Sequence, residues 1–441
     1  MRGDMTLELS HPFGPRLIAS RHRLANGLSV VLLPDRSAPV VAYQTWYRVG
    51  SRHEAPGQTG IAHLFEHLMF NQTETLAAGE FDRMLEAIGG ETNAGTWVDW
   101  TYYRDSLPAA ALPLAARLEA ERMHRLTLEE EQVASEKEVV LNERRFRVDD
   151  DVEGFLSEEL FRLAFTAHTY RHPTLGWRED VEAIGPEDAR AFYRQFYAPN
   201  NATLVIVGDF ESDAALRLVE EAYGGIAPAE IHAPVIPVEP PQRGERRALF
   251  AKPVTADRAI FAWKSPPQVH ADWVPLLVLS ELLCGGPSAR LHRELVVVRE
   301  VASRLHGTLA PFHDPGLFEI FVGMKRGHGI AEAEAVIDEA MARLAADVVT
   351  DLELGKVKNR LETELWSQLD TADGKAEALG HYQVTTGDSR VLFEVARRVD
   401  EVTAEELLRV AAAYLGKDGR SVVVAEPSGE EVDDEDEGED E

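Results

Sequence analysis

The sequence has little that is typical of a secreted, membrane-spanning or disulfide-stabilised protein. Cys284 is the only cysteine in 441 residues, which excludes an intrachain disulfide framework and a metal site built from cysteines. No run of about 18 apolar residues occurs, so we expect no membrane span. The N-terminus lacks a basic stretch followed by an apolar one, so no secretory signal is seen and a cytoplasmic protein is expected.

Positive charge is also scarce. Lys and Arg number 45 against 76 Asp and Glu, a formal net charge of −31, of which ten negative charges lie in residues 430–441. Binding to a nucleic-acid backbone requires clustered basic residues, so we expect no nucleic-acid partner. Residues 428–441 hold almost no apolar side chains, which predicts a disordered, solubilising tail.

Strand and helix patterns alternate along two stretches of the chain. The first stretch predicts a hairpin with a tight, two-residue turn in which Asn26 and Gly27 both have positive φ. It also predicts a strand at 40–49, a helix within 59–71, strands within 89–107, helices at about 108–125 and 129–147, and a buried strand within 198–209. The second predicts strands at 247–250, 259–263, 301–309, 317–322 and 421–427, and helices at 273–283, 330–347 and 352–369.

This pattern favours an α+β fold class with two domains. Strands that we expect to be mainly antiparallel mix with long helices in each half, and an internal duplication is the economical explanation. We predict a lead-in at 1–19, a first domain at 20–228, a Pro-rich linker at 229–246, a second domain at 247–427 and the acidic tail at 428–441.

Residues 60–70, GIAHLFEHLMF, combine an apolar helix stripe with a polar face. The stripe consists of Ile61, Leu64, Phe65, Leu68 and Met69. At 100° per residue, the opposite face carries His63, Glu66 and His67.

The two histidines of this helix are four residues apart, so their imidazole nitrogens can converge on one zinc ion at about 2.0–2.1 Å. Glu66 lies beside them, where its carboxylate could accept a proton from a water molecule. His-x-x-Glu-His is the inverted, or inverzincin, order of the commoner zinc-peptidase motif. The alternative is an exposed polar helix face that contains two histidines by chance.

A third ligand is expected from another element, and residues 135–143, SEKEVVLNE, offer two carboxylates. Glu136 and Glu143 share one helix face but are separated by about 10 Å of helix rise. Both cannot readily bind one ion, so one should be a ligand and the other a supporting group. An ordinary acidic helix is the alternative.

Further motifs spread over residues 20–426 support the metal-site reading. The inverted motif is followed by Glu143, 76 residues after His67. Together with the further motifs, this arrangement resembles the pitrilysin/insulysin family of zinc peptidases, in the branch of mitochondrial processing peptidase and its bacterial relatives. These motifs are HLMFNQTET, GGETNAGTWVDWTYY, AFTAHTYRHPTLGW, FYAPNNATLVIVGD and LLCGGPSARLHREL.

The resemblance implies a zinc metalloendopeptidase with one zinc ion per chain, and two homologous domains forming half of a clam-shell chamber. It implies that His63, His67 and Glu143 bind zinc, that Glu66 is the general base and that Glu136 supports the site. It also implies that an edge strand receives an extended peptide by β-augmentation. The substrate-binding residues would be Asn93, Ala94, Thr96 and Tyr103. A turn-capping role for Asn93 and a core role for Tyr103 stay open.

The sequence departs from the family in its second half. Self-sufficient members carry an Arg and a Tyr there that hold the substrate carbonyl, whereas the corresponding positions here are Val296 and Ser303. Arg299 and Arg304 are nearby but out of phase. We therefore expect the metal-bearing, beta-like subunit of a heterodimer whose homologous partner lacks the zinc motif. A catalytically silent structural subunit of a larger complex is the alternative.

Overall fold

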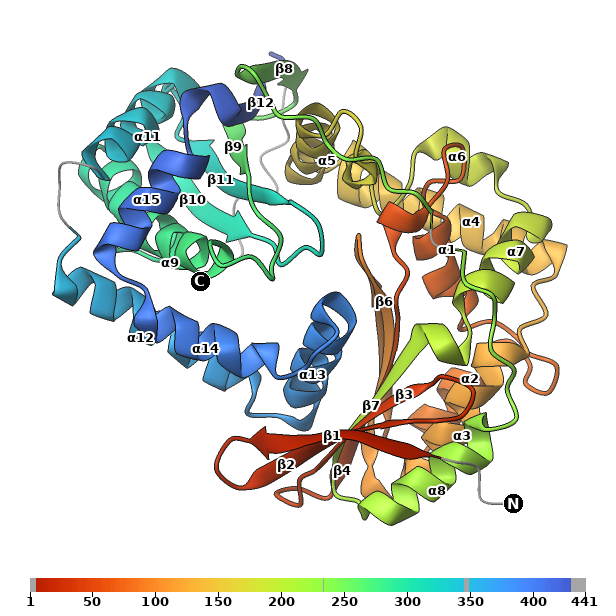
Figure 1. The fold of residues 1–441 in the computed structure, drawn as a ribbon. Helices are drawn as coiled ribbons and strands as arrows, with labels where there is room; N and C mark the ends of the chain where they lie inside the picture. The colour runs from red at the N-terminus through yellow and green to blue at the C-terminus, as the bar shows by residue number, and fades with distance from the viewer. Residues whose placement is uncertain (1–4, 233, 345–348, 430–441) are drawn as a thin grey trace. The chain divides into compact units, whose positions relative to one another are not determined.

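The computed structural model describes residues 5–232, 234–344 and 349–429 (Figure 1). Contacts divide the chain into two compact units, each described here by itself. The first unit comprises residues 1–143, 172–237 and 365–394, and the second comprises residues 144–171, 238–364 and 395–441. Most of the predicted acidic tail and the end of the helix predicted at 330–347 lie outside the described residues.

The first unit is built on a seven-stranded sheet with the strand order β1-β2-β3-β7-β4-β6-β5. All of its neighbouring strands are antiparallel except β3 and β7, which are parallel. Its strands are β1 (Thr6–Phe13), β2 (Leu17–Arg23), β3 (Ser29–Pro34), β4 (Val40–Tyr47), β5 (Glu91–Thr96), β6 (Thr101–Pro108) and β7 (Ala202–Gly208). Its helices are α1 (Ile61–Leu68), α2 (Glu80–Glu86), α3 (Leu112–His124), α4 (Glu130–Arg144, which ends one residue beyond the unit), α6 (Arg178–Ala183), α7 (Pro186–Phe196), α8 (Ser212–Tyr223) and α13 (Ala372–Thr386).

The core of the first unit forms where the apolar runs of the sequence meet. Every residue of β7 is buried, as expected for a central strand with the sequence ATLVIVG. The predicted apolar stripe of α1 is buried in the same core: Ile61, Leu64, Phe65, Leu68 and Met69 are at most 2% exposed. Burial of this stripe fixes which face of α1 points away from the core.

The hairpin predicted near Asn26-Gly27 is present, but its turn is longer than expected. β2 and β3 pair antiparallel with Arg23 opposite Ser29, which leaves five residues in the connection. Of these five connecting residues, only Gly27 has a positive φ, of 90°. A two-residue type I′ turn is therefore wrong here. Asn26 instead donates to the carbonyls of Tyr223 and Ile226, at 2.8 and 3.0 Å, which ties the turn to the end of α8.

Helix α13 reaches the first unit from the far end of the chain. It packs against β4 and β7, on the sheet face where Trp46 is buried. Lys375 of this helix pairs with Asp35 at 2.9 Å. The first unit thus includes residues that follow most of the second unit in the sequence, whereas the sequence predicted a division at the Pro-rich linker. The linear domain boundaries stay a prediction.

The second unit has a five-stranded sheet with the order β10-β11-β9-β12-β8, in which only β12 and β8 are parallel. Its strands are β8 (Arg246–Lys252), β9 (Arg258–Lys264), β10 (Ala302–Leu309), β11 (Leu317–Met324) and β12 (Arg420–Pro427). Its helices are α5 (Val152–Ala164), α9 (Trp273–Cys284), α10 (Arg290–His292), α11 (Ile330–Leu344), α12 (Asp351–Gln368), α14 (Val391–Glu401) and α15 (Ala404–Tyr414), and α12 and α14 each run a few residues into the first unit.

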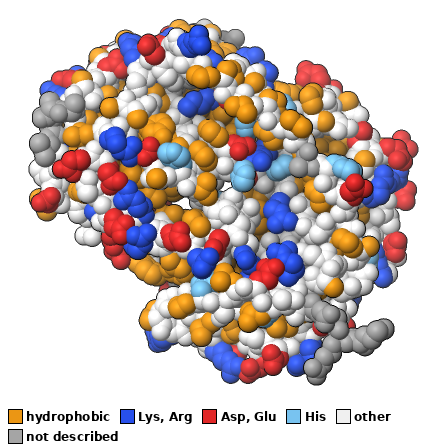
Figure 2. Space-filling model, viewed as in Figure 1, with side chains coloured by type: hydrophobic (Ala, Val, Ile, Leu, Met, Phe, Trp, Pro, Cys, Tyr) orange, Lys and Arg blue, Asp and Glu red, His pale blue; other side chains and the backbone are white. Residues whose placement is uncertain are grey.

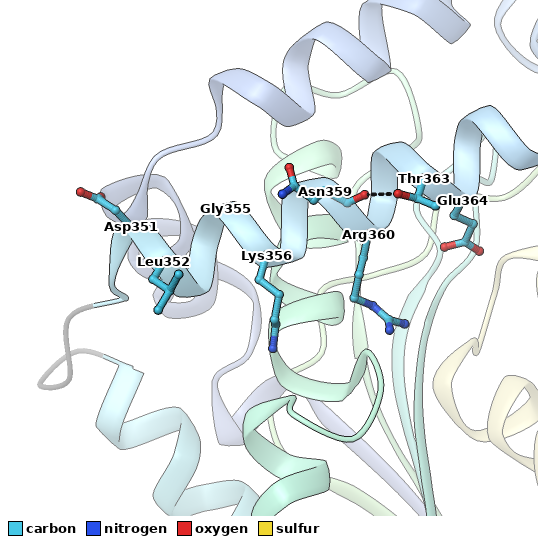
Figure 3. Close-up of a pocket in the computed structure, with 8 residues that line it drawn as sticks. All are labelled: Asp351, Leu352, Gly355, Lys356, Asn359, Arg360, Thr363 and Glu364. Atoms are coloured by element: carbon cyan, nitrogen blue, oxygen red, sulfur yellow. Dashed lines mark hydrogen bonds between the residues drawn. The ribbon is translucent and has the colours of Figure 1, made fainter.

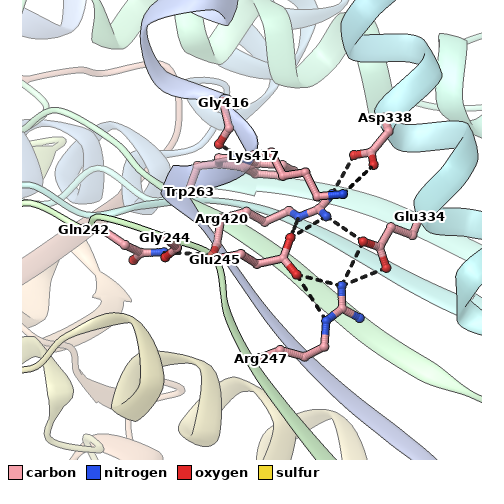
Figure 4. A network of polar contacts seen from close by, with 10 residues as sticks. All are labelled: Gln242, Gly244, Glu245, Arg247, Trp263, Glu334, Asp338, Gly416, Lys417 and Arg420. Atoms are coloured by element: carbon pink, nitrogen blue, oxygen red, sulfur yellow. Dashed lines mark hydrogen bonds and ion pairs between the residues drawn. The ribbon is translucent and has the colours of Figure 1, made fainter.

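A buried arginine joins three segments of the second unit (Figure 4). The guanidinium of Arg420, whose side chain is 1% exposed, donates to Glu245 at 2.6 Å, Glu334 at 2.6 Å and Asp338 at 2.7 Å. Arg247 also pairs with Glu334, at 2.8 Å. Because a buried charge is costly unless it is paired and hydrogen-bonded, these contacts fix α11 and the residues before β8 against the start of β12.

The predicted α+β class is confirmed by the two mixed sheets and their helices. Acidic and basic side chains are interspersed over the face shown in Figure 2. No helix among the described residues is long and apolar enough to cross a membrane. The cytoplasmic setting stays a prediction.

We predict that Gly380→Ala destabilises the first unit. A Cβ at Gly380 would lie 2.2 Å from Nε1 of Trp46, which is 1% exposed and cannot move aside freely. Overpacking of this kind costs about 1–3 kcal/mol, more than the helix propensity gained, and should lower the midpoint of thermal unfolding.

Gly355→Ala in α12 is the matched control, because a Cβ there meets no atom within 4 Å. It should leave the midpoint unchanged or raise it slightly. An equal response of the two variants would contradict the packing of α13 against Trp46.

Candidate metal centre

Helix α1 presents two imidazoles on the face that its apolar stripe leaves free. The ring centroids of His63 and His67 are 4.9 Å apart, as expected for residues one turn apart. The side chain of His63 is 8% exposed and that of His67 is 23% exposed. This face is therefore covered by another element rather than open to solvent.

Helix α4 supplies the carboxylates that face these rings. Oε2 of Glu143 lies 3.4 Å from Nε2 of His63 and 3.4 Å from Nε2 of His67. Oε2 of Glu136 lies 3.5 Å from the other ring nitrogen of His67, Nδ1. Asn71 follows α1 and donates to Oε1 of Glu136 at 2.8 Å. The two glutamates thus meet the histidines in different ways, and only Glu143 reaches both rings.

The electrostatics of this cluster favour a cation. Burial alone would lower the pKa of His67, but its hydrogen bonds with Glu136 and Glu143 and the charges of the nearby carboxylates, Glu66 included, raise that pKa to about 9. The hydrogen bond with His67 lowers the pKa of the Glu136 carboxyl in turn. The carboxylates around the two imidazoles therefore stabilise a positive charge at this point, either a proton on His67 or a bound cation.

The residues present fit a zinc ion. One donor atom each from His63, His67 and Glu143 lie within 4.8 Å of one another. Two imidazoles and one carboxylate are the ligand set of many catalytic zinc sites, which leave a fourth position open. The ligand distances of about 2.0–2.1 Å require each donor to move only slightly inward. Glu66 lies on α1 between the two histidines, half-buried, and its charge contributes to the raised pKa of His67.

The N-terminus of α1 is held by residues that the sequence pattern did not reveal. Glu54 is 3% exposed and accepts hydrogen bonds from the backbone N–H groups of Gly60 and Ala62, both at 2.9 Å. Burial raises the pKa of its carboxyl to about 8, against the opposing effect of these two donors. Hydrogen bonds from a loop to a helix end follow no periodic spacing, so no signal in the sequence could have found Glu54.

Strand β5, which carries three of the expected substrate-binding residues, is an edge strand. Among the described strands it pairs with β6 alone, so its other side is available for pairing. Asn93 is exposed, and its side-chain oxygen accepts from the N–H of Ala94 at 2.8 Å. Thr96 contacts the hydroxyl of Thr101 at 3.4 Å. An edge strand of this kind can accept an extended peptide by main-chain hydrogen bonds.

Tyr103 differs from these three residues because it is fully buried. Its hydroxyl lies 3.4 Å from the carbonyl oxygen of Phe65 and 3.4 Å from the hydroxyl of Tyr197. The guanidinium of Arg122 lies 4.4 Å from the centre of its ring. Tyr103 is thus a core aromatic, one of the two roles that the sequence left open.

The two positions that depart from the family pattern lie in the second unit. Val296 is in a π-helical turn, residues 293–298, and Ser303 is in β10 with its hydroxyl donating to the carbonyl of Gly323 at 3.2 Å. The nearby arginines are paired with acids: Arg299 with Glu294 at 2.7 Å, and Arg304 with Glu153 at 2.8 Å. That neither arginine takes the place of the substrate-holding Arg or Tyr stays a prediction.

Two further features, a hollow beside α12 and the single cysteine, are explained by local packing and ion pairs. A hollow of about 820 Å³ runs along one side of α12 (Figure 3), where Lys356 donates to the hydroxyl of Ser288 at 2.7 Å and Arg360 pairs with Glu281. Cys284 is buried at the end of α9, and burial raises the pKa of its thiol. Cys284 is therefore a buried thiol whose raised pKa disfavours the reactive thiolate.

Comparison with known proteins gives a consistent set of similarities. Residues 29–177 match the family described as Insulinase (Peptidase family M16), and residues 183–361 match the description Peptidase M16 inactive domain. The chain is 33% identical over 408 residues to the zinc protease PqqE of Helicobacter pylori, with 91% of each chain covered. It is 24% identical to the beta subunit of the mitochondrial-processing peptidase of Blastocladiella emersonii, covering 92% of this chain and 88% of that one.

Solved structures give the same result. The crystal structure of a protease from Helicobacter pylori superposes with a TM-score of 0.89 at 30% identity, covering 93% of this chain and 99% of that chain. A peptidase M16 inactive domain from Pseudomonas fluorescens shares the fold, with a TM-score of 0.83 at 18% identity and coverage of 93% and 98%.

We predict that zinc binding at this site releases a proton at neutral pH. Without metal, His67 has a pKa of about 9 and is protonated at neutral pH, so a zinc ion must displace close to one proton from it. Calorimetric titration in buffers of different ionisation enthalpy measures this number. The release should fall as the pH rises through about 9, the pKa at which half of the rings have already lost this proton.

Glu136→Gln provides the control for this titration. It removes one of the carboxylates that raise the pKa of His67, so fewer protons should be released at neutral pH. Zinc binding without proton release in the unaltered protein at neutral pH would contradict the charge distribution described above.

Proposed function

Because the chain belongs to the M16, or insulinase, family of peptidases, we propose that it is the metal-bearing subunit of a zinc-dependent metalloendopeptidase. One observation carries this proposal: donor atoms of His63, His67 and Glu143 converge within 4.8 Å. All three residues lie in the segment that matches the insulinase description, residues 29–177, rather than in the segment described as an inactive domain.

In this proposal His63, His67 and Glu143 hold one zinc ion per chain, and Glu136 orients His67. A hydrogen bond from Nδ1 of His67 to Glu136 leaves the lone pair on Nε2, the nitrogen that faces Glu143. Bound zinc supplies Lewis acidity and lowers the pKa of water towards neutrality. Asn71 keeps Glu136 in place through its hydrogen bond of 2.8 Å.

Glu66 is the proposed general base. It accepts the proton that a water molecule loses as its oxygen attacks the scissile carbonyl carbon, and then delivers that proton to the leaving amine. The substrate is a peptide in extended conformation. Backbone groups of β5 near Asn93, Ala94 and Thr96 pair with it by main-chain hydrogen bonds. Such pairing holds a peptide largely independently of its sequence, and the neighbouring side chains set preference.

The subunit is proposed to act as a heterodimer. A group that stabilises the developing oxyanion is typically worth several kcal/mol, and neither Val296 nor Ser303 can provide a positive charge or a phenolic hydroxyl. A homologous partner that lacks the His pair but retains an Arg and a Tyr at these positions would complete the site. The related beta subunit of a mitochondrial-processing peptidase, by its name, is also one part of a larger enzyme.

The same two positions support the alternative of a catalytically silent structural subunit. A scaffold, however, has no need for two histidines and two glutamates around one half-buried point. Activity measurements with and without a partner therefore decide between the two.

We predict that Glu66→Gln lowers peptide turnover by at least about 100-fold while one zinc ion stays bound, because a positioned general base contributes about 10²–10⁴-fold. Cleavage of a quenched fluorescent peptide and metal analysis of the same sample measure both effects. Glu332→Gln, an exposed acid of α11 in the second unit, should leave turnover unchanged. Retained turnover in Glu66→Gln would remove Glu66 as the base.

We predict that the isolated chain cleaves peptides weakly or not at all and gains activity when mixed with a homologous subunit that carries the Arg and Tyr. Turnover should rise with partner concentration until the two are equimolar. The Glu66→Gln chain mixed with the same partner should remain inactive, which assigns the activity to this chain. Full activity of the isolated chain would contradict the heterodimer. A zinc-loaded mixture that cleaves no peptide would favour the structural subunit.

A further inference from the structure

The helix that carries the histidines begins in an unusual way. α1 has only eight residues, and its N-cap is Gly60, with a φ of 87° and no side chain to accept a hydrogen bond. The first N–H groups of a helix have no partner within the helix and require one from outside. Here the partner is Glu54, six residues before the cap, whose Oε2 accepts from Gly60 and whose Oε1 accepts from Ala62.

The cap position is closed to any side chain that could do this work locally. A Cβ at Gly60 would lie 2.8 Å from the Cα of Gly176 and 2.8 Å from the carbonyl oxygen of Leu175. Gly176 is equally constrained, since a Cβ there would lie 2.4 Å from the carbonyl oxygen of Thr59. The backbone at Gly60 thus lies directly against the backbone at Gly176. A side chain at the N-cap position cannot fit, so the capping acceptor comes from another residue, Glu54.

A second set of contacts links Thr59, the residue before the N-cap of α1, to α6 and to the residue before it. The hydroxyl of Thr59 donates to Asp180 at 2.7 Å and accepts from the N–H of Trp177 at 2.9 Å. These bonds hold the residue before the cap. Glu54 reaches into the first turn itself, because Ala62 is the second residue of α1; the N–H of Ile61, its first residue, bonds to the carbonyl of Gln58 at 3.4 Å.

The first turn of α1 contains His63, directly after Ala62, and the ring of His63 meets only Glu143 of the two α4 carboxylates described above. His67 lies in the last turn, and its ring contacts both Glu143 and Glu136. Loss of the bond to Ala62 would let the first turn fray, as helix termini do when their N–H groups lack partners. Fraying would move His63 while His67 stayed in place. The two imidazoles would then no longer converge on one ion.

We propose that Glu54 is a positioning residue for the metal centre: by capping the first turn of α1 with both carboxylate oxygens, it fixes His63 relative to His67 and Glu143. This inference rests on the zinc site of the proposed function. It assigns to a buried loop carboxylate, which touches neither metal nor substrate, control over the geometry of one ligand.

Zinc binding by the metal-free, full-length protein tests this inference without any assay of activity. Glu54→Gln keeps the size of the side chain but replaces one acceptor by an NH₂ group that faces a backbone N–H. We expect its dissociation constant for zinc, measured by competition with a chromogenic chelator, to rise about tenfold, in the range known for groups that orient metal ligands. Visible absorption of the Co²⁺-substituted protein should also change, because it reports ligand geometry.

Asp151→Ala is the control for a general loss of stability, because alanine removes the side-chain acceptor that asparagine would keep. Asp151 caps α5 through a hydrogen bond of 2.6 Å from the N–H of Gly154, and α5 carries none of the proposed ligands. This variant should lose thermal stability and keep the zinc affinity and the Co²⁺ spectrum of the unaltered protein. Glu54→Asp, which keeps both oxygen atoms but is too short to reach both N–H groups, serves if Glu54→Gln does not fold, and should weaken zinc binding by a smaller factor.

A folded Glu54 variant with unchanged zinc affinity and an unchanged Co²⁺ spectrum would overturn the inference and leave the proposed function intact. Failure of the unaltered protein to bind zinc would overturn both. Equal weakening of zinc binding in Asp151→Ala would show a general effect of stability and would also overturn the role assigned to Glu54.

Discussion

The need to balance negative charge at one half-buried point is the constraint on which the rest of the first unit depends. Glu136 and Glu143 from α4 and Glu66 from α1 gather around the imidazoles of His63 and His67. These carboxylates raise the pKa of His67 although burial opposes the charged form, so this environment favours positive charge. One proton balances only part of the negative charge, whereas a divalent cation balances more of it and satisfies three donors at once.

Such a cluster forms only if the two partly polar helices that carry it, α1 and α4, are held rigidly by their apolar sides. The stripe of α1 is buried against the sheet, and Val133 and Val140 of α4 are buried in the same core. Side-chain burial fixes the rotation of each helix about its axis, while Glu54 and the glycine contact fix where α1 begins. Packing thus brings the helices together, and hydrogen bonds at the helix end set the position of the first ligand.

Features with a regular period were predictable from the sequence. The stripe of α1, strand β4 and the buried strand β7 follow from apolar spacing. The helices predicted at about 108–125, 129–147, 273–283 and 352–369 are present within a few residues of the predicted ends. The pair Glu136 and Glu143 was found because seven residues return to one helix face. Which of the two reaches both histidines was left open by the residues alone, and the packing of α4 on α1 is what distinguishes them.

Features that depend on contacts between distant segments were not predictable. Helix α13 has buried residues on several sides and packs through Gly380, so it has no clear apolar stripe and gives no sign that it joins the first unit. Glu54 is a single acid in a loop. The burial of Tyr103 was one of two open roles, because an aromatic residue in a strand can face either side.

Crystals of the zinc-loaded protein measured at the zinc absorption edge test the metal centre most directly. The account predicts a single anomalous peak per chain, about 2.0–2.2 Å from Nε2 of His63, Nε2 of His67 and a carboxylate oxygen of Glu143, with Glu136 hydrogen-bonded to His67. A peak held by other residues, direct ligation by Glu136 in place of Glu143, or no ordered zinc at the two histidines would contradict it.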